Sequence, residues 1–394
     1  MTALSTPTAT EIRPFEIAIS DEDLDDLRRR LDSARGPATF AGDGWERGVP
    51  VAYLRRIADY WRTSFDWRSQ EERLNAFPQF VTTIDGQPIH FLHVRSSARD
   101  AIPLVICHGY PSSIAEFTDL VGPLTDPQAH GLDTSVAFDV VVPSLPGFGF
   151  STPLAETGWN LGRTAKAIAE LMRRLGYERY GAHGGDIGAG ISGMLAAYDA
   201  EHVVGTHVLS DPLVLGLIEG MLPADTSAFS EPHQTRLAEL AAYGKEGRGY
   251  LAIQGTRPMT VGYGLGDSPI GQLAWIVEKF QEWTDASKPL PEDAVDLDQL
   301  LTNVSIYWFT NSATSAANFL YEAAHSFDWP GETDVPTAWG VFGDKAGIIR
   351  AVLDPGQQVG HWSEFDRGGH FAAMEAPDLL AADLRDFFGG LRPS

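Results

Sequence analysis

The sequence is poor in cysteine, in positive charge and in long apolar runs. Its 394 residues include one cysteine, Cys107, which excludes an internal disulfide framework and any metal site built from several cysteines. Lys and Arg number 29 against 53 Asp and Glu, a formal net charge of −24. Such a charge repels phosphate backbones and anionic membrane surfaces. No segment approaches the roughly 20 apolar residues that span a bilayer, and the first residues lack the basic start of a signal peptide. We therefore expect a soluble, cytoplasmic protein that binds neither nucleic acid nor membrane.

What is present is an ordinary globular composition, 43% hydrophobic and 21% charged, in a chain long enough for two or three domains or subdomains. Ser20 predicts the N-cap of a helix, with Asp23 at the capping-box position. The aromatic-rich stretch 45–80 is expected to pack against a larger body. Asp85-Gly86, between two extended runs, predicts a hairpin.

From residue 102 onward short apolar runs alternate with helical patterns, which predicts a mostly parallel sheet flanked by helices. Residues from about 211 to 330 interrupt this alternation and look mostly helical, with loops such as Gly262–Gly266. An insertion of this kind predicts a lid over the carboxyl ends of the strands, where ligands bind. The predicted division is an N-terminal extension packed on the body (1–95), the first part of an α/β core (96–211), a mostly helical lid (212–330) and the second part of the core (331–394).

The most informative motif is His183-Gly184-Gly185-Asp186-Ile187-Gly188, between a predicted strand and a predicted helix. Small residues around one reactive side chain at this place are typical of a nucleophile elbow. With Asp186 as the central residue, the nucleophile is a carboxylate, which attacks saturated carbon and leaves an ester. The alternative is that Asp186 only caps the helix that follows.

Hydrolysis of that ester needs a base to activate water. His370, in Gly368-Gly369-His370, lies after the last predicted strand, where this architecture places its histidine. Asp344, after the penultimate strand, is predicted to orient His370, with Asp354 and Glu332 as further candidates. The backbone N–H groups of Ile187 and of Tyr110 are predicted to hold the oxyanion.

These residues carry a resemblance to epoxide hydrolases of the microsomal type, which have the α/β-hydrolase fold. The resemblance extends over nearly the whole chain and rests on a set of further motifs, namely Trp45–Pro50, Phe65–Arg68, Phe77–Phe80, His108–Pro111, Pro143–Gly149 and Gly368–Ala373. It identifies residues 1–95 as that family's N-terminal type of extension. We expect this chain to lack the membrane anchor of the animal members, and the resemblance suggests a homodimer.

The resemblance also implies that lid tyrosines protonate the epoxide oxygen. Tyr250, followed by Gln254–Pro258, matches one such motif. The second match is offset, because an alignment without gaps from Tyr307 places Leu320 at the tyrosine's position and Tyr321 one residue later. One residue on a helix turns a side chain by about 100°, so we favour Tyr250 acting as the main donor and keep Tyr321 as a candidate site residue.

We therefore expect a hydrolase without cofactor or metal that adds water to an epoxide to give a vicinal diol, in detoxification or secondary metabolism. Aromatic residues in the lid suggest a hydrophobic or aromatic substrate, among them Trp275, Trp308, Phe309 and Phe319. One alternative is a haloalkane dehalogenase, which commonly has Trp next to the nucleophile where this chain has Ile187. The other is a catalytically inactive ligand-binding protein of the same fold.

Overall fold

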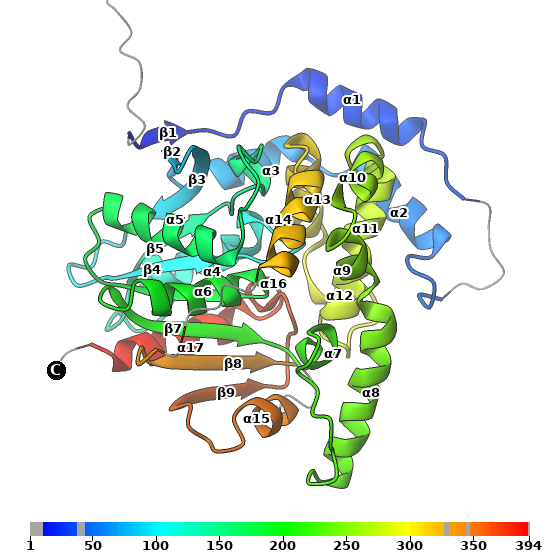
Figure 1. The fold of residues 1–394 in the computed structure, drawn as a ribbon. Helices are drawn as coiled ribbons and strands as arrows, with labels where there is room; N and C mark the ends of the chain where they lie inside the picture. The colour runs from blue at the N-terminus through cyan, green and yellow to red at the C-terminus, as the bar shows by residue number, and fades with distance from the viewer. Residues whose placement is uncertain (1–10, 38–43, 327–330, 332, 344–346, 393–394) are drawn as a thin grey trace, which may run out of the picture.

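The computed structural model describes residues 11–37, 44–326, 331, 333–343 and 347–392. Within these residues the strands are β1 (Arg13–Phe15), β2 (Gln79–Ile84), β3 (Gln87–Val94), β4 (Ile102–Cys107), β5 (Phe138–Pro143), β6 (Tyr180–Gly185), β7 (Val203–Ser210), β8 (Thr337–Phe342) and β9 (His361–Phe365). They form one sheet in the order β1-β2-β3-β5-β4-β6-β7-β8-β9 (Figure 1). The strands from β5 to β9 in that order are parallel, and β1, β2 and β3 join antiparallel. The predicted mostly parallel α/β sheet is confirmed.

Helices cover both faces of the sheet. Those beside it are α4 (Thr118–Thr125), α5 (Leu161–Arg174), α6 (Ile187–Tyr198), α15 (Gly347–Leu353), α16 (Ala372–Glu375) and α17 (Pro377–Gly390). Odd and even residues of β6 point to opposite faces. A methyl group on Gly181 would meet Phe388 of α17, and one on Gly184 would meet the backbone of Gly188 in α6. Thus α6, with α5 packed on it, covers one face, and α17, with α4 packed on it, covers the other.

Between β7 and β8 the chain leaves the sheet and forms the helical lid. Its helices are α7 (Val214–Leu217), α8 (Glu231–Gly247), α9 (Gly249–Gln254), α10 (Pro258–Asp267), α11 (Pro269–Trp283), α12 (Pro291–Ala294), α13 (Leu297–Phe309) and α14 (Ala313–His325). Figure 1 shows this group beside the arrowheads of β7 and β8. The lid therefore adjoins the carboxyl ends of the strands, where ligands bind in sheets of this kind.

The segment Gly262–Gly266 is helical, so the prediction of a loop there is wrong. It belongs to α10, which packs closely against α14. A methyl group on Gly262 would lie 2.5 Å from Oγ1 of Thr314, and one on Gly266 would lie 2.7 Å from Oδ1 of Asn311. These glycines allow two segments to approach each other and do not serve a turn.

The N-terminal extension contains the capped helix and the hairpin that the sequence predicts. Its helices are α1 (Asp21–Asp32), α2 (Val51–Thr63) and α3 (Trp67–Asn75). The Oγ of Ser20 caps α1 by accepting a hydrogen bond from the N–H of Asp23 at 3.1 Å. Asp85-Gly86 connects β2 to β3, with positive φ angles at both residues. These two strands extend the core sheet, because β3 pairs with β5.

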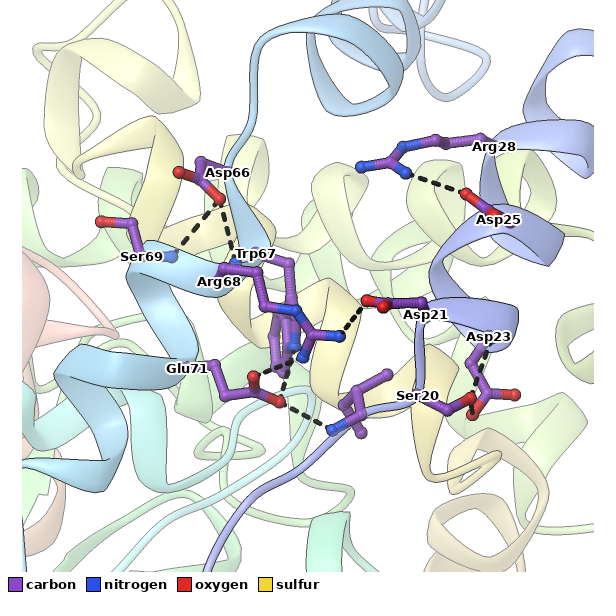
Figure 2. Close-up of polar contacts among 11 residues, drawn as sticks. Ser20, Asp21, Asp23, Asp25, Arg28, Asp66, Trp67, Arg68, Ser69 and Glu71 are labelled. Carbon is purple, nitrogen blue, oxygen red and sulfur yellow. Dashed lines mark hydrogen bonds and ion pairs between the residues drawn. The ribbon is translucent and has the colours of Figure 1, made fainter.

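A cluster of polar contacts holds the beginning of α1 and the residues just before it against α3 (Figure 2). Arg68 donates to Asp21 at 2.6 Å and to Glu71 at 2.5 Å. Glu71 also accepts the backbone N–H of Ile19 at 2.7 Å. Trp67, whose Nε1 donates to Glu71 at 3.1 Å, also meets Phe309 of α13 edge-on, with ring centroids 5.0 Å apart. The extension thereby contacts both the core and the lid.

Candidate active site

Asp186 lies between the end of β6 and the start of α6, in a conformation that is rare for a residue with a side chain. Its φ is 53° and its ψ is −123°, and such strain is concentrated at functional sites. The side chain makes no capping hydrogen bond to α6. Instead, Oδ1 accepts the backbone N–H of Tyr110 at 2.9 Å. The helix-cap alternative is therefore not what the structure shows.

The glycines around Asp186 are required by close backbone contacts. A methyl group on Gly184 would lie 2.3 Å from the carbonyl carbon of Gly188, and one on Gly188 would lie 2.0 Å from the carbonyl oxygen of Cys107. Across the turn, a methyl group on Gly109 would lie 2.4 Å from Cβ of Asp186. The glycine pattern of the sequence thus reflects the tight packing of the elbow against the end of β4.

His370 follows β9 and faces the nucleophile. Its Nε2 lies 3.8 Å from Oδ2 of Asp186. Its backbone N–H donates to the carbonyl of Trp283 in the lid at 2.9 Å. A methyl group on Gly369 would lie 2.6 Å from that same carbonyl oxygen. The loop carrying His370 therefore depends on the lid for its position.

The carboxylate that holds His370 is Asp211, one residue after β7. Its Oδ2 lies 2.8 Å from Nδ1 of His370, and its Oδ1 accepts the backbone N–H of Leu213 at 2.8 Å. The predicted orienting residue, Asp344, lies outside the described residues. Asp211 is not among the residues predicted from the sequence, although an acidic residue at the end of the strand after the nucleophile strand is a signal that could have identified it.

Of the two other candidate acids, only Asp354 is among the described residues, and it does not hydrogen-bond to the histidine. Asp354 accepts the backbone N–H groups of Gln358 and Val359, at 2.7 and 3.2 Å, and so closes the turn after α15. Glu332 lies outside the described residues. Among the described carboxylates, only Asp211 hydrogen-bonds to His370.

The surroundings of His370 favour its protonated form. Burial alone would lower the pKa of the imidazole, but the hydrogen bond and charge of Asp211, together with Asp186 and Glu116, raise the pKa from 6.5 to about 9. Loss of the negative charge on Asp186 would remove one of these influences. The basicity of His370 is thus linked to the state of the nucleophile.

Tyr250, in α9 of the lid, lies beside the residues of this site. Its ring lies parallel to that of Tyr110, with centroids 6.0 Å apart, and meets Trp283 edge-on at 5.3 Å. The hydroxyl makes no hydrogen bond to any of the described residues, and it is therefore available to a ligand. Burial, followed by the charge of Asp186, raises the pKa of Tyr250 well above its usual value, so the group remains a proton donor.

Tyr321 lies elsewhere in the lid. Its ring stacks on His325, one turn later in α14, with centroids 4.1 Å apart. Its contacts within the described residues include no hydrogen bond or ring contact to Tyr250 or Asp186. Leu320, one residue earlier, is buried in the apolar cluster that contains Tyr250.

The second predicted oxyanion donor, Ile187, is the first residue of α6. The first N–H groups of a helix have no partner within it, so this position suits an anion. Tyr110 supplies the observed N–H contact to Asp186. A small hollow of about 10 Å³ lies beside these groups, and Asp186, His370, Ser112 and Glu116 line it.

Comparison with known proteins agrees with this geometry. Residues 12–117 match the family described as "Epoxide hydrolase N terminus", and residues 102–241 match the "alpha/beta hydrolase fold". Epoxide hydrolase 1 of Oryctolagus cuniculus is 36% identical over 96% of this chain and 89% of its own length. The chain belongs to the epoxide hydrolase family. A protein of Stigmatella aurantiaca (strain DW4/3-1), provisionally named an epoxide hydrolase, is 46% identical over 97% of this chain and 86% of its own length.

Solved structures of the family have the same fold. The epoxide hydrolase of Aspergillus niger is 30% identical, with a TM-score of 0.79 over 97% of each chain. The juvenile hormone epoxide hydrolase of Bombyx mori is 29% identical, with a TM-score of 0.79 over 97% of this chain and 94% of its own. The α/β-hydrolase fold and the hydrolase class that the sequence predicts are confirmed. Within the described residues, no helix combines the length and hydropathy needed to cross a bilayer.

Proposed function

We propose that this member of the family opens its epoxide by attack of Asp186 on a ring carbon. The new bond joins a carboxylate oxygen to that carbon, and the bond from the carbon to the epoxide oxygen breaks. Tyr250 gives its proton to the departing oxygen, which is a poor leaving group without a donor. The free hydroxyl of Tyr250 supports this role, and its raised pKa keeps the phenol protonated until the epoxide oxygen develops negative charge.

His370 then activates the water that hydrolyses the ester. A proton passes from water to Nε2, and the water oxygen bonds to Cγ of Asp186. The N–H groups of Tyr110 and Ile187 stabilise the oxyanion. When the ester bond to the alkyl oxygen breaks, that oxygen takes the second water proton from the new carboxylic acid, which leaves the diol and the Asp186 carboxylate. The proton on His370 then restores the phenol of Tyr250.

Asp211 is the residue that we assign to orient His370. Its hydrogen bond at 2.8 Å keeps the proton on Nδ1, so Nε2 can accept one from water. The ester on Asp186 carries no charge, so its formation removes one anion that raises the pKa of His370. Ring opening thereby favours the neutral form of His370, which is the form that accepts a proton in the second step.

A hydrophobic substrate is supported by the apolar cluster that contains Tyr250, whose members include Leu320 and Trp283, the latter in ring contact with Tyr250. Of the lid aromatics considered from the sequence, Trp275 lies near the site, because its Nε1 donates to the hydroxyl of Tyr110 at 2.6 Å. Phe319 packs on Phe148 in the interior, with ring centroids 5.5 Å apart. Screening aliphatic and aryl epoxides for diol formation tests this part of the proposal.

The observation that carries the proposal is the strained Asp186, whose carboxylate lies between the N–H of Tyr110 and Nε2 of His370. A single turnover in ¹⁸O-labelled water tests it. Hydrolysis of an ester at Cγ leaves the label in the carboxylate of Asp186, and the first diol carries an unlabelled enzyme oxygen. Label in that first diol, with none in Asp186, would mean that water attacks the epoxide directly.

A further inference from the structure

An additional acid, Glu116, faces the catalytic groups and has no part in the mechanism described so far. It lies in the 3₁₀ helix η1 (Ile114–Phe117), a few residues after the N–H of Tyr110. Its side chain lines the hollow of about 10 Å³ together with Asp186 and His370. A hollow of about 10–15 Å³ is the size that holds one water, provided that two or more polar groups surround it.

The carboxyl group of Glu116 is held at one oxygen and open at the other. The Oγ of Ser112 donates to Oε2 at 2.5 Å. Oε1 makes no hydrogen bond to any of the described residues. Glu116 is 8% exposed, so the interior shields it from bulk solvent. This open oxygen belongs to a side chain that borders a hollow of one-water size, so a water there can donate a hydrogen bond to it.

Glu116 and His370 influence each other without touching. Each changes the pKa of the other, and no ion pair joins them within the described contacts. Groups separated in this way can be bridged by one water. Nε2 of His370 also lies 3.8 Å from Asp186, so a water in the hollow has all three groups around it.

We propose that Glu116 binds the water that hydrolyses the Asp186 ester and aims its oxygen at Cγ. This role rests on the proposed function. The water donates one hydrogen bond to Nε2 of His370 and one to Oε1 of Glu116. The first proton moves to His370 as the new carbon–oxygen bond forms, and Glu116 keeps its negative charge and stabilises the imidazolium. Ser112 is a positioning residue, since it acts through Glu116.

The test measures the two half-reactions separately in Glu116→Gln. Rapid-quench mass spectrometry of the intact protein, with an epoxide turned over by the wild type, gives the alkylation rate and the ester hydrolysis rate. Ring opening does not use this water, so alkylation should change by less than about threefold. Hydrolysis should slow by roughly 10- to 100-fold, because a misdirected nucleophile loses reactivity of that order.

The pH dependence of ester hydrolysis supplies a readout that a purely structural role would not move. The titratable groups that face Glu116 are His370, Asp186 and Tyr307. Glu116 raises the pKa of His370, so the acid limb of the profile should move to lower pH in Glu116→Gln. Burial raises the pKa of Glu116 to about 7, and the hydrogen bond from Ser112 opposes this. Ser112→Ala should therefore move the limb to higher pH.

Glu375→Gln is the matched control. Glu375 is also a buried acid near His370, and burial raises its pKa to about 8. Its two carboxyl oxygens accept the backbone N–H groups of Phe371 at 3.0 Å and Asp285 at 2.7 Å, and it does not line the hollow. Its loss should not slow hydrolysis selectively over alkylation, and it should shift the acid limb less than Glu116→Gln does.

The inference is overturned if Glu116→Gln hydrolyses the ester at the wild-type rate with an unchanged acid limb, or if both half-reactions slow equally. If Glu116→Gln does not fold, Ser112→Ala serves as the test. An acid limb of ester hydrolysis that stays in place or moves to lower pH in Ser112→Ala then overturns the inference. An ester that forms on Asp186 in all these variants keeps the proposed function intact. Absence of any ester in the wild type would instead refute the proposed function itself.

Discussion

Replacement of Asp211 by Asn tests which acid serves His370. The pKa of the imidazole is raised from 6.5 to about 9, and Asp211 provides the largest of the influences that raise it. A shift of that size corresponds to about 3 kcal/mol in favour of the imidazolium. The imidazolium forms as water gives up its proton, so losing most of this stabilisation slows that step by about 100-fold. An Asn can also donate to Nδ1 and leave the proton on Nε2, which adds to the loss.

The assay is the decay of the alkyl-enzyme ester, followed by mass spectrometry after rapid quenching. Asp211→Asn should slow this decay by about 100-fold or more, with a much smaller effect on alkylation. Asp354→Asn is the control, because Asp354 binds the backbone of its own turn. Its ester should decay close to the wild-type rate. If Asp344→Asn gives the selective loss and Asp211→Asn does not, the assignment is refuted and the prediction from the sequence is correct.

Two further results are expected. Tyr250→Phe should slow alkylation by about 100-fold or more in pre-steady-state measurements, and Tyr321→Phe by less than about threefold; comparable large losses would make Tyr321 a second donor. Burial alone would raise the pKa of Asp383, but contacts with His207, Ser363 and His361 hold this pKa at about 2. Ionised Asp383 therefore stabilises the fold above about pH 4, and this contribution is lost as the pH falls towards 2. Denaturant titrations of Asp383→Asn should show a free energy of unfolding that is about 2 kcal/mol lower than that of the wild type at neutral pH. This difference should shrink between about pH 4 and 2, and a difference independent of pH would contradict the reasoning.

The sequence was informative where local geometry imposes residue types. The elbow could be predicted because only glycine fits at two positions around Asp186. Gly184 lies against the backbone of Gly188, and Gly188 lies against the backbone of Cys107. The position of His370 after the last strand follows from chain order. The strands of the α/β core also show as short apolar runs, which is why their alternation predicted the sheet.

The sequence was less informative where the identity of a site residue depends on which strands are neighbours in the sheet. Asp211 meets His370 because β7 lies between β6 and β8 in the sheet, and no local pattern reports that order. The glycines of α10 were misinterpreted for a similar reason, since their use depends on Thr314 of a helix that comes later in the chain. The offset between Leu320 and Tyr321 could be seen in the sequence, but the partner of Tyr321, His325, could be assigned only from the structure.

The central claim is that Asp186 forms a covalent ester that only His370 can release by activating water. His370→Gln tests it most directly, because this change removes the base and leaves the nucleophile. After incubation with an epoxide that the wild type converts, we expect the peptide containing Asp186 to be heavier by one substrate mass, and the adduct to persist. A His370→Gln enzyme that turns over normally without any adduct on Asp186 would contradict the account.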